Sequence, residues 1–319
     1  MTLALEVRNL RKTFGGGRTL TGRPRPEIHA VRDVSLSARK GETLGIVGES
    51  GCGKSTLARM LVGLLKQTKG EIVIEGKNLS DQVGDPAAFG RLIQYVFQDP
   101  ISSLNPRKTI REILEAPLIH LLGMDESARK ARITELFDAV NLRDEFLTRY
   151  PHEFSGGQAQ RIGIARALAA SPRILVLDEP VSALDVSVQA QVLNLLADLR
   201  KAMDLTYLFI SHDLAVVEAV SDSVAVLYFG RVVEVGRAES IFSAPRHPYT
   251  SLLARSAPIV GRDLARTESL AVELPDPLRP PSGCAFAARC PSATMVCRDK
   301  APAIEAFSQD HEAACHHPL

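Results

Sequence analysis

The chain has 319 residues, of which 45% are apolar and 24% are charged. This length and apolar content suffice for one large or two small buried cores. Because 38 basic and 37 acidic side chains leave a formal charge of +1, bulk electrostatic attraction to nucleic acid or anionic lipid is excluded. The N-terminus lacks the charged start and long apolar run of a signal peptide, and the other apolar runs are too short to span a bilayer. We therefore expect a cytosolic chain.

The first 245 residues alternate short apolar runs with longer helical patterns, which indicates an α/β fold. Several of the short runs are apolar on both faces, as a buried mixed or parallel sheet requires. The predicted strands are residues 43–48, 71–76, 93–97, 174–178, 207–211 and 224–229. Between residues 110 and 140 helical patterns follow one another without a strand, which predicts a helical subdomain inserted into the sheet domain.

The stretch "GESGCGKST" fits the P-loop pattern G-x-x-x-x-G-K-[ST] and lies between a predicted strand and a helical run, which is the context this motif requires. In such a loop, glycines let main-chain N–H groups turn toward an anion. Lys54 reaches the β- and γ-phosphates and Ser55 offers a hydroxyl to Mg²⁺. The predicted ATP-binding residues here are Gly48, Glu49, Ser50, Gly51, Cys52, Gly53, Lys54, Ser55 and Thr56. We expect the Cys52 side chain to do no chemistry.

The run "ILVLDEP" brings two acidic residues to the end of a predicted strand. Asp178 is placed to hold Mg²⁺ through its hydration shell, and Glu179 is placed to polarise an attacking water. Taken alone, a carboxylate pair that caps a strand explains the run equally well. In a chain that already contains a P-loop, the run predicts the second half of a nucleotide site.

The stretch "FSGGQAQRIGIARAL" predicts a second anion-binding helix N-terminus, formed by Ser155, Gly156, Gly157 and Gln158. One triphosphate does not need two such sites from the same subunit. Here the sequence resembles the ATP-binding subunits of ABC transporters, whose signature motif is of the type LSGGQ. The resemblance implies a P-loop NTPase core and two subunits paired head to tail, with ATP between the P-loop of one and the signature of the other. Phe154 replaces the leucine of the motif, and Ala159 replaces a usual arginine.

The same resemblance implies roles for further residues. Gln98 would contact Mg²⁺ and the water, and His212 would contact the γ-phosphate. The catalytic residues implied are Glu179, His212 and Gln98, and the Mg²⁺ ligands implied are Ser55, Gln98 and Asp178. Residues 182–185 match the loop that crosses the dimer interface. Phe14 resembles the aromatic that stacks on adenine, with a core aromatic as the alternative because a Gly-, Arg- and Pro-rich stretch follows it.

Two further stretches, "FQDPISSLNPRKTI" and "GCAFAARCPSATMVC", resemble the oligopeptide and dipeptide importer ATPases. The insertion before Ile28 resembles the F-type subunit of such importers. The division implied is an ABC ATPase domain over residues 1–245, with its helical subdomain at about 100–170, and a C-terminal extension over 246–319. A proline-rich connector over 275–283 precedes the cysteines of this extension.

The cysteine cluster of the extension follows the spacing C-x5-C-x6-C-x17-C and consists of Cys284, Cys290, Cys297 and Cys315. In a cytosolic protein, clustered cysteines indicate metal or redox chemistry. Four thiolates can hold a [4Fe–4S] cluster or Zn²⁺. The resemblance implies the [4Fe–4S] cluster, because some importer ATPases carry one at this motif. Two alternatives stay open, namely Zn²⁺ with help from His311, His316 or His317, and unligated thiols.

The resemblance implies a peripheral ATPase on the cytoplasmic face of the bacterial inner membrane that powers uptake of peptides or a related small solute. Its partners would be a paralogous D-type ATPase subunit, two transmembrane permease subunits and a periplasmic or lipid-anchored binding protein, and no nucleic acid. A soluble ABC ATPase of DNA repair or translation is the alternative, but the tandem halves, coiled-coil insertions and basic patches of such proteins are missing from the sequence. The C-terminal motif disfavours an exporter. The sequence does not distinguish dipeptides from oligopeptides, glutathione, nickel chelates or opines.

Overall fold

The structure of the chain is a computed structural model that describes residues 2–17, 25–82, 84–256 and 274–319. Part of the insertion before Ile28 and residues 257–273 of the predicted extension lie outside the described residues. The chain forms two compact units, each assembled from segments that are distant in sequence. Unit 1 comprises Met1–Leu5, Ala38–Thr43 and Val73–Ile210, and unit 2 comprises Glu6–Ser37, Leu44–Ile72 and Ser211–Leu319.

Unit 1 contains three parallel strands, which pair in the order β6 (Ile93–Val96), β7 (Ile174–Asp178) and β8 (Thr206–Ser211). Every residue of β7 and β8 is buried, because these strands are apolar on both faces. The register places Val176 opposite both Tyr95 and Leu208. Asp178 is the last residue of β7, so its carboxylate lies at the carboxyl ends of the strands.

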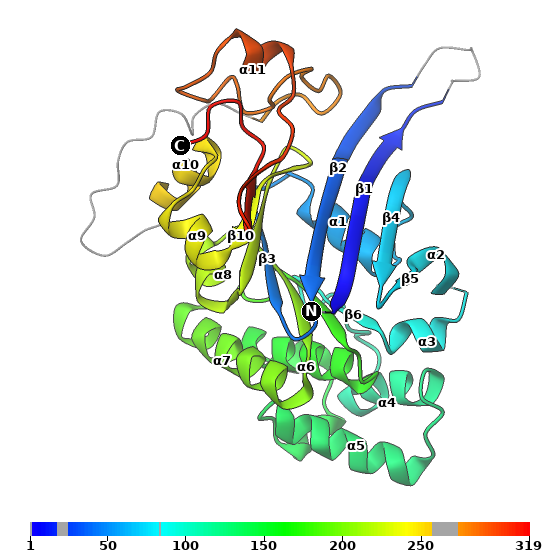
Figure 1. The fold of residues 1–319 in the computed structure, drawn as a ribbon. Coiled ribbons are helices and arrows are strands. Elements are labelled where there is room, and N and C mark those ends of the chain that lie inside the picture. The colour runs from blue at the N-terminus through cyan, green and yellow to red at the C-terminus, as the bar shows by residue number, and fades with distance from the viewer. Residues whose placement is uncertain (1, 18–24, 83, 257–273) are drawn as a thin grey trace. The chain divides into compact units, whose positions relative to one another are not determined.

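The longer helices of unit 1 are grouped in the lower part of Figure 1. The short elements are β5 (Lys77–Asn78), α2 (Leu79–Gln82), α3 (Pro86–Gly90), η1 (Asp144–Thr148) and η2 (Pro151–Glu153). The longer helices are α4 (Ile110–His120), α5 (Glu126–Ala139), α6 (Gly156–Ala169) and α7 (Val186–Met203). Helices α4, α5 and α6 pack against one another. Because α4 and α5 follow each other without a strand, the helical run predicted over residues 110–140 is confirmed.

Unit 2 contains five strands that pair in the order β11-β12-β10-β9-β3. They are β3 (Thr43–Val47), β9 (Ser223–Tyr228), β10 (Arg231–Arg237), β11 (Glu305–Ser308) and β12 (His311–Ala313). Strands β3 and β9 are parallel, whereas the other neighbours are antiparallel. The two strands of the predicted extension, β11 and β12, were not predicted, since each is very short.

A buried contact between His311 and Glu234 joins β12 to β10 within unit 2. His311 Nε2 lies 2.7 Å from Glu234 Oε1, and the side chain of Glu234 has no exposed surface. The Glu234 carboxylate also accepts hydrogen bonds from the main-chain N–H groups of Arg246, at 2.6 Å, and His247, at 2.9 Å. A buried carboxylate needs such partners, so His311 stabilises the docking of β12.

Two long strands, β1 (Leu3–Gly15) and β2 (Glu27–Arg39), run side by side (Figure 1), and most of their residues belong to unit 2. Strand β4 (Lys69–Ile74) pairs with β1 on its other edge. The helices of unit 2 are α1 (Lys54–Leu61), α8 (Leu214–Val220), α9 (Ala238–Ser243), α10 (Pro248–Ser256) and α11 (Met295–Asp299). All six strands predicted from the sequence are present as β3, β4, β6, β7, β8 and β9, whereas β1, β2, β5, β10, β11 and β12 were not predicted.

Candidate functional site

The P-loop of unit 2 connects β3 to α1 and is shaped by its glycines. Gly53 is the N-cap of α1 and has φ +104°, a main-chain conformation that residues other than glycine rarely adopt. A Cβ atom at Gly53 would collide with the carbonyl oxygen of Ala30, and one at Gly48 would collide with that of Leu227. The glycines of the motif therefore permit both the turn and its close approach to neighbouring main chain.

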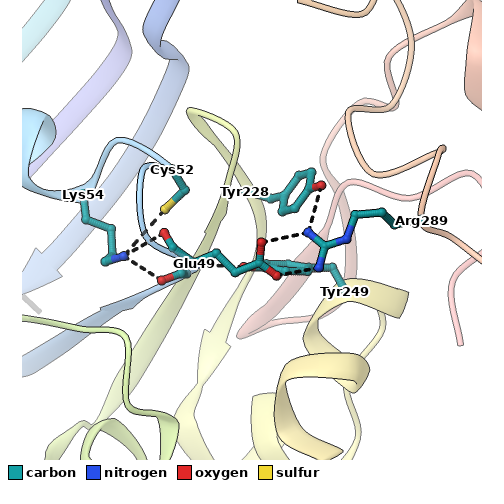
Figure 2. Close-up of polar contacts among 7 residues, drawn as sticks. Glu49, Cys52, Lys54, Tyr228, Tyr249 and Arg289 are labelled. Carbon is teal, nitrogen blue, oxygen red and sulfur yellow. Dashed lines mark hydrogen bonds and ion pairs between the residues drawn. The ribbon is translucent and has the colours of Figure 1, made fainter. Parts of the chain in front are cut away.

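Lys54 is buried at the start of α1, and its ammonium group lies within the loop. Its Nζ donates hydrogen bonds to the carbonyl oxygens of Gly48, at 2.6 Å, and Glu49, at 3.0 Å, and lies 3.9 Å from Cys52 Sγ. Figure 2 shows this arrangement. The loop thus concentrates one positive charge where the motif predicts phosphate binding.

The Glu49 side chain is paired with Arg289, which the sequence analysis missed (Figure 2). The two residues are 240 positions apart, so no local pattern connects them. Tyr228 and Tyr249, which also contact this group, were missed for the same reason. The one usable signal was the charge of Arg289 directly before a cysteine of the predicted cluster.

Unit 1 brings together Gln98 and Glu179, two residues predicted to act in hydrolysis. Gln98 Nε2 donates a hydrogen bond of 2.9 Å to Glu179 Oε2. Glu179 has a left-handed main chain with φ +48°, and its N–H donates to the carbonyl oxygen of Ile210 at 2.8 Å. Non-glycine residues in this region are uncommon and cluster at functional sites. The neighbouring Asp178 is buried and accepts a hydrogen bond of 2.5 Å from the hydroxyl of Tyr95.

The predicted signature lies at the start of α6, with Ser155 as its N-cap. Ser155 and Gln158 form a capping box, in which the Gln158 N–H donates to Ser155 Oγ and the Ser155 N–H donates to Gln158 Oε1. Ser155 and Gly156 are exposed. A Cβ atom at Gly157 would collide with the Val188 side chain, which explains why a glycine occupies that position.

The second predicted interface loop, residues 182–185, ends at the N-cap of α7. Asp185 accepts hydrogen bonds from Ser187 Oγ, at 2.7 Å, and from the Val188 N–H, at 3.0 Å. The hydrogen bond from the Ser187 hydroxyl is the main reason that the pKa of Asp185 lies below its usual value. The Asp185 carboxylate therefore serves as the N-cap of α7.

The other predicted residues of the nucleotide site are His212 and Phe14, both in unit 2. His212 is exposed and follows β8. Phe14 is 38% exposed, and Lys12 Nζ lies 5.0 Å from its ring centroid. An aromatic with this exposure is not part of the core, whereas its contact with adenine stays a prediction. The P-loop, His212 and Phe14 thus belong to unit 2, and the Gln98–Glu179 pair, Asp178 and the signature belong to unit 1.

The four predicted cysteine ligands line one small cavity of unit 2, together with His247, His316 and His317. The Cys284 N–H donates to the Cys297 carbonyl oxygen at 2.7 Å. Burial raises the pKa of the Cys284 and Cys290 thiols, and raises that of Cys315 to about 11.

Metal ligation at this cavity receives no support from the side-chain geometry. Among residues 2–17, 25–82, 84–256 and 274–319, no three His, Cys, Asp or Glu side chains are placed to hold a metal ion. The three histidines predicted to assist Zn²⁺ have other partners: His311 contacts Glu234, His316 Nε2 contacts the Lys300 carbonyl oxygen and His317 Nε2 contacts Thr294 Oγ1. By contrast, His247 Nε2 is buried without a hydrogen-bond partner in the described structure.

Within the described residues, no helix has both the length and the apolar character needed to cross a membrane.

Comparison with known proteins places these features in a family. The ABC transporter family matches residues 31–182, and the C-terminal region of oligopeptide/dipeptide transporters matches residues 233–297. The chain is similar to the oligopeptide transport ATP-binding protein AppF of Bacillus subtilis, with 46% identity over 98% of this chain and 96% of the relative. It is also similar to the dipeptide transport ATP-binding protein DppF of Haemophilus influenzae, with 47% identity over 99% and 97%.

Solved structures agree with this similarity. A dimer of the ATP-binding cassette MJ0796, in a post-hydrolysis state bound to ADP and Pi, matches with a TM-score of 0.65 and 31% identity, over 73% of this chain and 98% of that one. The cassette cbiO1 of Clostridium perfringens matches with a TM-score of 0.65 and 25% identity, over 76% and 92%. The P-loop, the acidic strand end and the C-terminal region therefore lie on the mixed α/β fold of an ABC ATPase. The chain belongs to the family of ABC transporter ATP-binding proteins, in the oligopeptide and dipeptide transport group.

Proposed function

We propose that this chain powers the uptake of peptides or a related small solute by hydrolysing ATP at an interface with a second ATPase subunit. The observation that carries the proposal is similarity over nearly the whole chain to proteins named for oligopeptide and dipeptide transport. It covers both the ATPase region and the C-terminal region that distinguishes this transporter group. DNA repair or translation, the alternative function, is not favoured by these relatives.

In unit 2, residues Gly48–Thr56 bind the phosphates of ATP through the loop main chain and Lys54. The support is the buried Lys54 ammonium, whose hydrogen bonds to loop carbonyls can be exchanged for bonds to phosphate oxygens. His212 contacts the γ-phosphate, and the exposed ring of Phe14 stacks on adenine.

The residues that the resemblance to ABC ATPases assigns to Mg²⁺ are Ser55, Gln98 and Asp178. A hydroxyl, a carboxylate and an amide oxygen are the ligands that Mg²⁺ prefers, so the residue types fit the ion. Gln98 uses its Nε2 on Glu179, which leaves its amide oxygen for the metal. When bound, Mg²⁺ neutralises charge that develops on the phosphates. Glu179, oriented by Gln98, accepts the proton of the attacking water.

The signature residues Ser155, Gly156, Gly157 and Gln158 contact ATP that is bound to the P-loop of the other subunit. An exposed helix N-terminus suits an anion because of its orientation of main-chain N–H groups and its dipole, and Ser155 and Gly156 are exposed at this one. The similar cassette MJ0796 is described as a dimer bound to ADP and Pi, which agrees with two subunits around the nucleotide.

The partners that transport requires are transmembrane permease subunits. The finer assignment is a heterodimer with a paralogous D-type ATPase, two permeases, and a periplasmic or lipid-anchored binding protein at the inner membrane, with this chain on the cytoplasmic face. We assign residues 1–245 to the ATPase domain, with a helical subdomain at about 100–170, and 246–319 to the extension. Family matches at residues 31–182 and 233–297 support a division of this kind.

The cysteine set is proposed to hold a [4Fe–4S] cluster. The proposal rests on the cysteine spacing and on the fact that Cys284, Cys290, Cys297 and Cys315 line one cavity, although their side chains are not arranged around a metal position among the described residues. The histidines proposed for Zn²⁺ have other hydrogen-bond partners, so zinc is the weaker assignment. No step of ATP hydrolysis depends on this group.

The experiment that tests the proposed function is transport by the assembled complex in lipid vesicles. Labelled dipeptides and oligopeptides should accumulate only when ATP is present on the side of the ATPases. The Lys54→Ala variant, assembled in the same way, should abolish accumulation. ATP hydrolysis that responds to DNA ends or ribosomes, with no peptide uptake, would replace the transport assignment by the alternative.

A further inference from the structure

Glu49, the second residue of the P-loop, is held by residues from distant segments of unit 2. The guanidinium group of Arg289 donates two hydrogen bonds to its carboxylate, from Nη1 to Oε2 at 2.7 Å and from Nη2 to Oε1 at 2.8 Å. The Glu49 main-chain N–H donates to the Tyr249 hydroxyl at 2.9 Å. In Figure 2, Arg289 reaches Glu49 from the side away from Lys54. The loop is therefore held on both sides.

This contact is a buried, charged and geometrically specific one. The Arg289 side chain is 3% exposed, and that of Glu49 is 23% exposed. The guanidinium carbon lies 5.7 Å from the ring centroids of both Tyr228 and Phe286, and Nη1 lies 3.3 Å from the Tyr228 hydroxyl. Two parallel hydrogen bonds from one guanidinium to one carboxylate are the strong form of such a pair.

Arg289 belongs to the cysteine-bearing part of the chain. It directly precedes Cys290, and the segment around it is closed by the hydrogen bond from the Cys284 N–H to the Cys297 carbonyl oxygen. Arg289 is thereby fixed to the cysteine-bearing segment, and a displacement of that segment would move its guanidinium group relative to Glu49.

We propose that Arg289 is a positioning residue of the ATP site. It neutralises the Glu49 carboxylate and holds the P-loop, so that the C-terminal extension and the nucleotide are energetically coupled. This inference rests on the proposed assignment of the P-loop to ATP. It adds a residue outside the motif, and it assigns the extension a role in nucleotide affinity.

If Arg289 acts through charge, replacing Arg289 and replacing Glu49 should change ATP affinity in opposite directions, whereas a purely structural contact predicts a loss of affinity for both. A carboxylate in a phosphate-binding loop repels ATP unless a cation compensates it. If Arg289 is replaced by Met, Glu49 stays charged and ATP binding weakens. If Glu49 is replaced by Gln, the repelling charge disappears and ATP affinity is kept or rises. When both replacements are combined, the second should offset much of the loss caused by the first.

The coupling is also reciprocal, because an effect of the extension on ATP affinity implies an equal effect of ATP on the extension. ATP should therefore stabilise the docked segment. Amide hydrogen exchange of residues 284–297 should slow when ATP and Mg²⁺ are added to the full-length chain, and Arg289→Met should remove that difference.

The experiment measures MgATP affinity of the full-length chain, and KM and kcat of the assembled transporter, for four variants. Arg289→Met should weaken ATP binding by roughly tenfold, which corresponds to a loss of about 1.4 kcal/mol of binding free energy. KM should rise more than kcat falls. Glu49→Gln should bind ATP at least as well as the wild type, and Glu49→Gln combined with Arg289→Met should recover to within about threefold. Arg298→Met, at an exposed arginine of the same extension, is the matched control and should change nothing.

The inference is overturned if Arg289→Met binds ATP normally, or if Glu49→Gln weakens binding as much as Arg289→Met. If Arg289→Met does not fold, the Glu49→Gln affinity and the wild-type exchange experiment decide, and the absence of ATP-dependent protection over residues 284–297 overturns the coupling. A separate outcome concerns the proposed function: if Lys54→Ala binds ATP normally, the P-loop assignment fails, whatever Arg289 does.

Discussion

Gln98 donates a hydrogen bond of 2.9 Å from its side-chain nitrogen to the carboxylate of Glu179, the residue that follows the buried strand β7. This bond fixes the direction of a carboxylate whose own main chain is in the left-handed region, with φ +48°. A general base must lie within hydrogen-bond reach of the proton it removes, and an oriented carboxylate meets that need with less reorganisation. The pair is the part of the proposed hydrolytic site that unit 1 assembles by itself.

The first prediction concerns the signature. Ser155→Arg should leave ATP binding to this chain's own P-loop unchanged and reduce turnover of the assembled transporter by at least about tenfold, because it fills the helix N-terminus that we propose to contact the partner's nucleotide. Binding to the isolated chain and ATPase activity of the complex are measured side by side.

The control for this variant is Thr109→Arg, which removes the capping box of α4 in the same unit. Both variants lose one helix cap, so they should unfold at similar denaturant concentrations. If Ser155→Arg instead abolishes ATP binding in the isolated chain, the signature acts on the nucleotide of its own subunit.

The second prediction concerns the Cys52 thiol of the P-loop. Its side chain is 1% exposed, and burial raises its pKa above the usual value of 9.0. Since the thiolate is the reactive form, alkylation by iodoacetamide at pH 8 should be at least about tenfold slower in the folded chain than in urea.

The same shift has a consequence for stability. The unfolded chain releases this proton at a lower pH than the folded chain does, so the Cys52 contribution to stability is complete below pH 9.0 and declines as the pH rises through the folded pKa. The comparison with Cys52→Ala should show this decline disappear. Rapid alkylation of folded protein at pH 8, located at Cys52 by mass spectrometry, contradicts the buried thiol.

The third prediction concerns the buried contact between Glu234 of β10 and His311 of β12. His311→Ala leaves the Glu234 carboxylate buried with one partner fewer, and should lower the free energy of unfolding by about 2–4 kcal/mol. Glu312→Ala, at the exposed neighbouring position of the same strand, should change it by less than about 0.5 kcal/mol. Urea unfolding measures both, and equal effects of the two variants contradict a specific role for His311.

The sequence predicted the features that depend on local patterns. The strands around Ile46, Val176 and Leu208 were found because short continuous runs of apolar residues are typical of buried parallel strands. The P-loop was found because its glycines and Lys54 have a fixed spacing. The contact between Glu49 and Arg289 was not predictable, since it depends on how two segments 240 residues apart come together in the fold.

Short or polar elements were missed for a related reason. Strands β1 and β2 alternate buried and exposed positions irregularly, and β12 has three residues, so its pairing to β10 comes from tertiary contacts such as that of His311. The pairing of Gln98 with Glu179 also comes from the fold. Strands β6 and β7 are hydrogen-bonded neighbours, although the helical segment separates them in the sequence.

The fourth prediction concerns the cysteine cavity. Anaerobically purified protein should be brown and contain about four irons per chain, and Cys290→Ser should remove the colour. Cys52→Ser, which changes the cysteine of the P-loop instead, should keep the iron. Colourless protein with stoichiometric zinc, or with neither metal, rejects the cluster and leaves the ATPase assignment intact.

The fifth prediction contrasts two residues of the ATP site. Lys54 carries charge that attracts phosphates in the ground state and in the transition state, so Lys54→Ala should weaken ATP binding and hydrolysis together. Glu179 is proposed to act only as the water is deprotonated, so Glu179→Gln should leave ATP affinity unchanged or improved while turnover falls.

Turnover of the assembled transporter with Glu179→Gln, measured beside its ATP affinity, tests the central assignment most directly. We expect a loss of roughly 10²-fold or more in kcat without loss of binding, and a stable ATP-dependent complex with the partner ATPase on size-exclusion chromatography. Turnover near the wild-type rate in the same complex would contradict this assignment, because the proton of the attacking water would then be accepted by a residue other than Glu179.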